Sequence, residues 1–177
     1  MDVVFTVGHS THPLEDFLGL LRRHGVATLA DVRRHPGSRR LPWFAAESLR
    51  EAWPGYVHLP ELGGRRSRRR DSPNTGWQVA AFAAYADHMA GGEFERGVAR
   101  LLGLPAPVAI MCAEGNWWQC HRRLIADALV ARDHRVLHIA RDGSVTEHEL
   151  TPFAVVEPGD PPRLRYPPPQ LELERDG

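Results

Sequence analysis

Apolar residues along the chain follow two spacings, the short continuous run of a buried strand and the three-to-four-residue repeat of a helix. Residues 3–7 form a β-rich apolar run that ends at a glycine, which predicts a strand. Apolar side chains then recur at helical spacing from Leu14 to Leu21, and a second apolar run occupies residues 26–30. Strand, helix and strand in this order predict a βαβ unit with parallel strands and a right-handed crossover.

The same two spacings continue through most of the chain. We expect further strands at residues 56–59, 107–111, 135–139 and 144–148, and helices at 45–52, 77–89, 93–102 and 120–132. This order predicts an α/β fold: a single three-layer domain over residues 1–157, with a mainly parallel central sheet and helices on both faces. Residues 158–177 contain six prolines and little core pattern, so we expect an extended or frayed tail there. Residues 63–75 carry few apolar side chains, and we expect a mobile loop.

Length and composition are those of one globular domain. No apolar run approaches the roughly 20 residues that a membrane span needs. The sequence enters its first strand pattern without the features of a secretory signal, and it has two cysteines. These features predict a cytoplasmic protein, away from the membrane, whose cysteines are thiols rather than a disulfide framework. The oligomeric state is left open.

Charge is distributed unevenly, although the formal net charge is zero. Residues 31–70 contain ten arginines against four acidic residues, whereas residues 71–177 contain ten arginines against fifteen. A basic surface in the middle of the chain suits an anionic ligand better than it suits a membrane.

Polar or thiol-bearing residues follow three of the predicted strands, namely His9 and Ser10, Asp31 and Arg33, and Cys112 and Glu114. The carboxyl ends of parallel strands lie at one edge of a sheet, where open α/β sheets bind their ligands. We therefore expect these side chains to meet in one crevice.

The segment from Met111 to Arg123 joins the third of these strand ends to a predicted helix. Cys120, His121 and Arg122 fall in the first turn of that helix, where backbone N–H groups and partial positive charge favour an anion. A second interpretation is a structural cap, in which His121 packs and Arg122 pairs with an acid. Cys112 is either a small buried residue or a nucleophile whose thiol pKa is lowered by the helix and nearby arginines.

An arginine-rich loop, residues 33–40, follows the second strand directly and includes Ser38 and Arg39. Arginines among Pro, Gly and Ser offer many hydrogen-bond donors to a phosphate. Trp43 and Phe44 follow this loop, and their aromatic faces are suited to stacking on bases. The alternative is a solvated loop without a ligand. For the arginines of residues 65–70, the solvated loop is the preferred interpretation.

Several ordered motifs resemble those of the domain-of-unknown-function 488 family: Thr6-Val7-Gly8-His9-Ser10, Asp31-Val32-Arg33, Pro36-x-Ser38-Arg39, Phe44, Leu62-Gly63-Gly64, Cys112-Ala113-Glu114 and Cys120-His121-Arg122. The resemblance extends from about Val3 to Ile139. It implies a compact bacterial or archaeal cytoplasmic α/β domain and marks the same polar strand ends. It implies no settled activity or substrate.

We expect an enzyme that acts on a phosphate-containing substrate, a nucleotide or nucleic acid, without a cofactor or a metal ion. In this hypothesis Arg33, Arg39 and Arg122 hold the phosphate, and the remaining substrate contacts are Ser10, Ser38 and Cys120. A histidine is the general acid or base, oriented by a carboxylate, and the candidates are His9 or His121 with Asp31 or Glu114. Cys112 either attacks the substrate or shapes the floor of the crevice.

Two other functions stay open. One is a non-catalytic nucleic-acid-binding module that uses the loops 33–40 and 65–70 together with Trp43 and Phe44. The other is a metal-dependent hydrolase with Cys112, Cys120 and His121 as ligands, and with His9 as a possible fourth; the spacing of the two cysteines is unusual for zinc.

Overall fold

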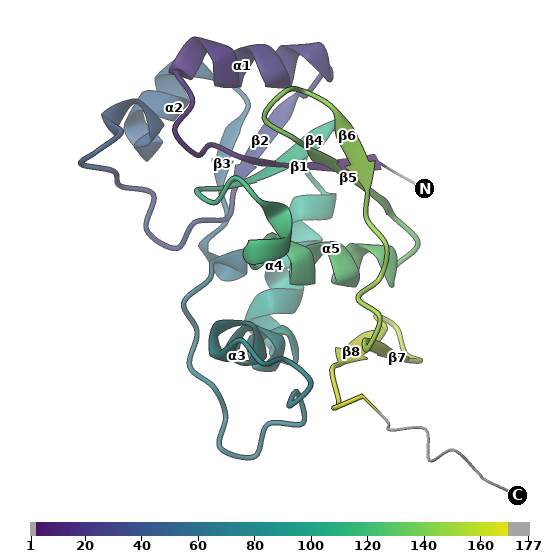
Figure 1. Cartoon of the computed structure of the whole chain (residues 1–177). Coiled ribbons are helices and arrows are strands. Elements are labelled where there is room, and N and C mark those ends of the chain that lie inside the picture. The colour runs from purple at the N-terminus through teal and green to yellow at the C-terminus, as the bar shows by residue number, and fades with distance from the viewer. Residues whose placement is uncertain (1–2, 170–177) are drawn as a thin grey trace, which may run out of the picture.

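A computed structural model describes residues 3–169 and contains one six-stranded sheet with the order β3-β2-β4-β1-β5-β6. The strands are β1 (Val3–Gly8), β2 (Thr28–Asp31), β3 (Tyr56–His58), β4 (Val108–Cys112), β5 (Arg135–Ile139) and β6 (Val145–Glu147). The first five are parallel to their neighbours, and β6 pairs antiparallel with β5 (Figure 1). The predicted α/β fold with a mainly parallel sheet is therefore confirmed.

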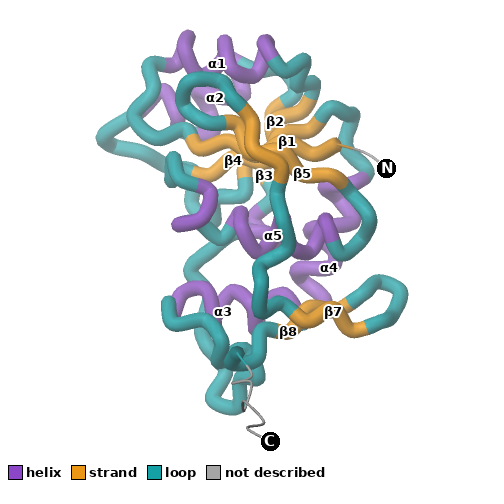
Figure 2. The backbone as a smooth tube through the Cα atoms, turned by 45° about the vertical axis from the view of Figure 1, so that its right-hand side comes forward, coloured by secondary structure: helices purple, strands orange, loops and turns teal. Residues whose placement is uncertain are grey.

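Within the described residues, five α-helices accompany the sheet: α1 (Leu14–Arg23), α2 (Ala46–Ala52), α3 (Ala80–Met89), α4 (Gly92–Leu102) and α5 (Arg122–Val130). In Figures 1 and 2, α1 and α2 lie on one side of the strands, and α3, α4 and α5 lie on the other. Three single 3₁₀ turns occur at Pro42–Phe44, Pro60–Leu62 and Trp117–Gln119.

Two hydrophobic clusters use alternate residues of β4. Met111 packs in the cluster that contains Phe17 and Leu21 of α1, whereas Ile110 and Cys112 belong to the cluster that contains α3, α4 and α5. Successive side chains of a strand point to opposite faces, so Cys112 is directed toward the α5 side. All five residues of β4 are buried, which explains why this strand appears in the sequence as a continuous apolar run.

The C-terminal segment is part of the compact structure. β7 (Val155–Glu157) and β8 (Arg163–Arg165) form a second, two-stranded sheet, and Tyr166 directly after β8 is fully buried. The Tyr166 hydroxyl donates to Asp127 Oδ2 at 2.8 Å, and its ring lies 5.2 Å from that of Trp77. Residues 163–165 are extended, as expected, but they are paired and packed rather than frayed, because they form β8 and precede the buried Tyr166. Residues 170–177 lie outside the described part. One buried aromatic among prolines has no periodic pattern, and for that reason the sequence did not indicate it.

The loop of residues 63–75, which we expected to be mobile, is anchored by the buried carboxylate of Asp87 in α3. Asp87 accepts hydrogen bonds from the Arg69 backbone N–H, the Ser72 hydroxyl and the Asn74 amide. No helix within residues 3–169 is long and apolar enough to cross a membrane.

Candidate functional site

The carboxyl ends of β1, β4 and β2 lie side by side, as the sequence predicted. Gly8 is in register with Cys112, and the His9 N–H donates to the Cys112 carbonyl at 2.9 Å. The loop after β4 approaches β1 so closely that a Cβ atom on Gly8 would overlap the Glu114 carbonyl. Glycine is therefore required at position 8 for the two strand ends to meet.

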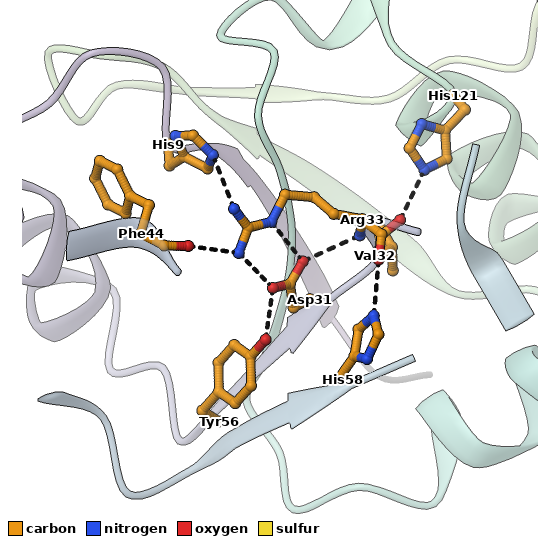
Figure 3. Close-up of polar contacts among 8 residues, drawn as sticks. All are labelled: His9, Asp31, Val32, Arg33, Phe44, Tyr56, His58 and His121. Carbon is orange, nitrogen blue, oxygen red and sulfur yellow. Dashed lines mark hydrogen bonds and ion pairs between the residues drawn. The ribbon is translucent and has the colours of Figure 1, made fainter. Parts of the chain in front are cut away.

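Asp31 and Arg33 form a buried ion pair beneath the crevice (Figure 3). Arg33 donates from Nε to Asp31 Oδ1 at 2.9 Å and from Nη2 to Oδ2 at 2.6 Å. The Tyr56 hydroxyl donates to the same Oδ2 at 2.6 Å, and the Phe44 carbonyl accepts a further bond from Arg33 Nη2. These contacts fix the plane of the guanidinium group and leave it little capacity for a ligand.

His9 lies between this guanidinium and the ring of Phe44, on which it stacks at 4.3 Å. Its Nδ1–H donates to the Ser10 carbonyl at 2.9 Å, so Nε2 is the acceptor that faces Arg33 Nη1 at 3.3 Å. Burial, reinforced by the charge of Arg33, lowers the pKa of His9 to about 4. His9 is therefore neutral at pH 7 with both ring nitrogens engaged, and it does not fit the expected role of a general acid or base near neutral pH.

A cavity of about 550 Å³ opens at this edge of the sheet. The predicted site residues that border it are His9, Arg33, Ser38, Cys112, Glu114, Cys120 and His121. Its remaining border includes Arg34 and His35 of the predicted arginine-rich loop, Gly64 and Arg65, which the sequence placed only in wider motifs, and Phe82, Tyr85 and Gln119, which sequence reasoning did not select. The predicted crevice is thus a real concavity that gathers arginine, histidine and thiol side chains from several loops.

Four predicted site residues lie elsewhere. Arg122 is only 1% exposed; it donates to Thr6 Oγ1 at 3.2 Å and to the Glu114 carbonyl at 2.6 Å. It braces the loop after β4 from inside the protein, whereas we expected it to hold a phosphate. Asp31 is fully buried behind Arg33, Arg39 is exposed away from the cavity, and Ser10 borders a separate cavity of about 210 Å³.

The two cysteine sulfurs are 2.7 Å apart. Cys120 Sγ also lies 3.5 Å from His121 Nδ1. The other ring nitrogen, His121 Nε2, is 3.2 Å from the Val32 carbonyl, which can only accept a hydrogen bond. Nε2 is therefore the protonated nitrogen, and Nδ1 is the acceptor that faces the sulfur. Cys120 thus has the nearby base and the orienting contact that a thiol nucleophile requires.

The two thiols have opposite pKa shifts. Burial and the contact with Cys120 raise the pKa of Cys112 well above its usual range. Burial also acts to raise the pKa of Cys120, but the Cys112 thiol, His121 and Arg122 outweigh it, so that the Cys120 pKa lies well below its usual range. Cys120 additionally precedes the N-terminus of α5, whose partial positive charge favours a thiolate. The structure therefore assigns thiolate character to Cys120 rather than to Cys112.

Arg34 and Arg65 supply the positive charge that a ligand in the cavity would meet. Arg34 Nη1 donates to the Arg65 carbonyl at 2.8 Å, and neither guanidinium forms an ion pair with a carboxylate of residues 3–169. Arg34 belongs to the arginine-rich loop of residues 33–40, but the sequence analysis assigned the phosphate contact to its neighbour Arg33. Arg65 was grouped with a solvated loop, and no local signal distinguished it from the arginines that follow it.

Gly64 and Tyr85 support His121 from the other side. A Cβ on Gly64 would lie 3.1 Å from His121 Nδ1, and the Tyr85 ring centroid lies 5.0 Å from that of His121. Within the motif Leu62-Gly63-Gly64, Gly64 is thus explained by close packing on the imidazole, and Gly63 by its close approach to the Arg34 backbone. Within the described residues, no three His, Cys, Asp or Glu side chains are arranged to hold a metal ion.

Together these features define an α/β domain with a thiol- and arginine-lined cavity at the carboxyl edge of a parallel sheet. The chain belongs to the family described as "Domain of unknown function DUF488", whose sequence pattern matches residues 13–129. This confirms the resemblance drawn from the motifs. Comparison with curated proteins and with solved structures gave no significant match.

Proposed function

We propose that the protein is an enzyme that acts on a phosphate-bearing substrate, a nucleotide or nucleic acid, in the 550 Å³ cavity. The observation that carries the proposal is the position of Arg34 and Arg65, two arginines without a carboxylate partner in residues 3–169, beside the Cys120–His121 pair. A doubly charged phosphate group needs cationic donors, and guanidinium groups can supply them in bidentate pairs.

Binding and positioning are divided among different arginines in this proposal. Arg34 and Arg65 contact the phosphate, with Ser38 nearby and the N-terminus of α5 adding favourable electrostatic potential. Arg33 is already paired with Asp31, so it positions the floor of the cavity. Arg122 positions the loop that carries Glu114.

Cys120 is the nucleophile and His121 is its base. His121 Nδ1 takes the thiol proton, the sulfur attacks phosphorus, and a sulfur–phosphorus bond forms as the bond to the leaving oxygen breaks. The leaving oxygen takes the proton from His121. A water molecule then attacks phosphorus and gives a proton to His121 Nδ1, and the sulfur–phosphorus bond breaks to release phosphate and restore the Cys120 thiolate. Cys112 forms the floor and donates its thiol hydrogen to Cys120.

The binding half of the proposal is tested by isothermal titration calorimetry with inorganic phosphate and with a nucleoside monophosphate. Arg34→Gln with Arg65→Gln should weaken binding by about tenfold or more, since each lost charge-assisted hydrogen bond is worth about 1.5–3 kcal/mol. Arg68→Gln with Arg70→Gln is the matched control, because both are exposed arginines of the same region that do not border the cavity. An equal loss of phosphate affinity in the two double variants would show that the attraction is non-specific, and it would overturn the assignment of Arg34 and Arg65 as the phosphate-binding residues.

The chemical half is tested with the same phosphate esters as substrates. Cys120→Ser should abolish turnover while it leaves phosphate affinity nearly unchanged, because Cys120 supplies the attacking atom rather than the binding charge. Turnover that survives in Cys120→Ser would exclude sulfur as the nucleophile.

Non-catalytic nucleic-acid binding is the second candidate function. It is favoured by Trp43, which is 36% exposed next to the exposed Arg39 and Arg40. Phe44 does not contribute, because it is fully buried and stacked on His9. This function predicts a steep salt dependence of oligonucleotide affinity, which Arg39→Gln should reduce because it removes a phosphate contact. Trp43→Ala should lower the affinity itself, because it removes a stacking contact.

A further inference from the structure

The two cysteines form a close sulfur pair that phosphate chemistry does not require. Their sulfurs are 2.7 Å apart, so a small movement brings them to the disulfide bond length of about 2.05 Å. Both side chains are free thiols, and both border the 550 Å³ cavity. A small reagent that enters the cavity therefore reaches two thiols in mutual contact.

We propose that Cys112 and Cys120 are a redox-active dithiol whose substrate is a hydroperoxide, with Cys120 as the attacking thiol and Cys112 as the resolving thiol. The Cys120 thiolate attacks the terminal peroxide oxygen; a sulfur–oxygen bond forms, the oxygen–oxygen bond breaks, and the released alkoxide or hydroxide takes a proton. Sulfur is oxidised to sulfenic acid and the peroxide is reduced to an alcohol or water.

Resolution then occurs within the same chain. Cys112 attacks the sulfenic sulfur as it gives up its thiol proton, a disulfide forms, and the sulfur–oxygen bond breaks to release water. An external dithiol restores both thiols by exchange and is itself oxidised to a disulfide.

The surroundings determine which thiol attacks. Cys120 has His121 Nδ1 at 3.5 Å and precedes the N-terminus of α5, and both features stabilise a thiolate. Cys112 lies at the end of β4, where burial and the contact with Cys120 raise the pKa of its thiol. Cys120 therefore attacks first, and Cys112 reacts after the electrophilic sulfenic sulfur is formed beside it.

The backbone around the pair favours an intramolecular product. Arg122 holds the carbonyls of Glu114 and Gly115 from inside, and the His9 N–H holds the Cys112 carbonyl. Both cysteines are buried, so the thiol of a second chain cannot reach them as readily as they reach each other. Oxidation should therefore give a monomeric disulfide rather than a cross-linked dimer.

The test treats the reduced full-length protein with one equivalent of hydrogen peroxide, followed by alkylation and intact mass measurement. The wild-type protein should lose two hydrogens, resist alkylation, form no disulfide between chains and recover with dithiothreitol. Cys112→Ser should stop at a sulfenic acid that dimedone traps, and Cys112→Ala provides the same test if the serine variant does not fold. Cys120→Ser should react far more slowly.

The role of His121 is tested by the rate of the first step. His121→Gln should slow oxidation by roughly threefold for each unit by which the Cys120 pKa rises above the assay pH, since a more basic thiolate is scarcer but more nucleophilic. His35→Gln is the matched control, because His35 borders the same cavity without a contact to either sulfur.

Three outcomes would overturn the proposal: no loss of hydrogen in the wild-type protein, a disulfide-linked dimer, or equal reactivity of Cys120→Ser and Cys112→Ser. The proposal does not rest on the phosphate function, because these assays contain no phosphate ester. If the dithiol proposal fails, the calorimetric result for Arg34 and Arg65 is unchanged. If those two arginines do not bind phosphate, the oxidation assays are unaffected.

Discussion

Replacement of Asp31 by asparagine tests whether the buried ion pair under the cavity supports the fold. Asp31 is fully buried and accepts hydrogen bonds from the Arg33 N–H, Nε and Nη2 and from the Tyr56 hydroxyl. Asparagine has a single acceptor oxygen, and its NH₂ group would face donors. The substitution also leaves the guanidinium of Arg33, which is 8% exposed, without a counterion.

The loss in free energy of unfolding follows from the uncompensated charge of Arg33. Removal of one partner of a buried ion pair destabilises a protein by about 3–5 kcal/mol. With a urea m-value of about 2–3 kcal/mol/M, the unfolding midpoint should fall by about 1–2.5 M. Since the total stability of a domain is about 5–15 kcal/mol, this loss is a large fraction of it and is measurable.

Urea unfolding followed by circular dichroism measures this change, and Asp71→Asn is the matched control. Asp71 also pairs with an arginine, Arg69 at 3.2 Å, but its side chain is 77% exposed, so its loss should cost less than about 1 kcal/mol. Arg33→Met in the Asp31→Asn background should recover part of the stability, because it removes the unpaired charge. Equal midpoints for Asp31→Asn and Asp71→Asn would refute the reasoning.

Three further predictions concern the site and its supports. The pKa of His9 is lowered from 6.5 to about 4, so between these pH values the unfolded chain binds a proton that the native protein does not. This difference lowers the free energy of unfolding by about 3 kcal/mol as the pH falls from 6.5 toward 4, and it has no effect above pH 6.5. Unfolding of His9→Gln from pH 7 to 4 should show a shallower decline, and an unchanged profile would contradict this. Gly8→Ala should displace the loop after β4 and thereby abolish the proposed oxidation of Cys112 and Cys120 to a disulfide. Gly19→Ala is the control: the space around its Cβ in α1 is open, so the substitution should stabilise the protein by about 1 kcal/mol in thermal unfolding. Tyr166→Phe should cost about 1.5–3 kcal/mol, because it removes the hydrogen bond to the buried Asp127 carboxylate; a neutral effect would mean that this contact does not anchor the C-terminal segment.

Most elements of the fold could be predicted from local pattern. β4 is an unbroken apolar run because it is covered on both faces, and α1 shows a clear apolar stripe because only one side of it is buried. Neighbours in the sheet could not be predicted in this way. β4 lies between β2 and β1, and such pairing depends on contacts between residues far apart in the chain.

The site was predicted in its location but not in its details. Parallel strands place their ends at one edge, so His9, Arg33 and Cys112 were expected to meet, and all three border the cavity. Arg122 and Arg34 are chemically alike in the sequence, yet one braces a loop from inside and the other borders the cavity. Arg122 is directed into the protein because Thr6 Oγ1 and the Glu114 carbonyl accept its hydrogen bonds. The local sequence does not indicate where these two acceptors lie.

The sequence by itself determined the order of the strands and helices of the main sheet, the family, and the sheet edge at which the reactive residues gather, because these follow from periodicity and motif spacing. Only the tertiary structure decided that the pKa of Cys120 is lowered while that of Cys112 is raised, that the pKa of His9 is lowered, and that Tyr166 is part of the core. These properties depend on burial and on partners brought together from distant parts of the chain, and a one-dimensional pattern contains neither.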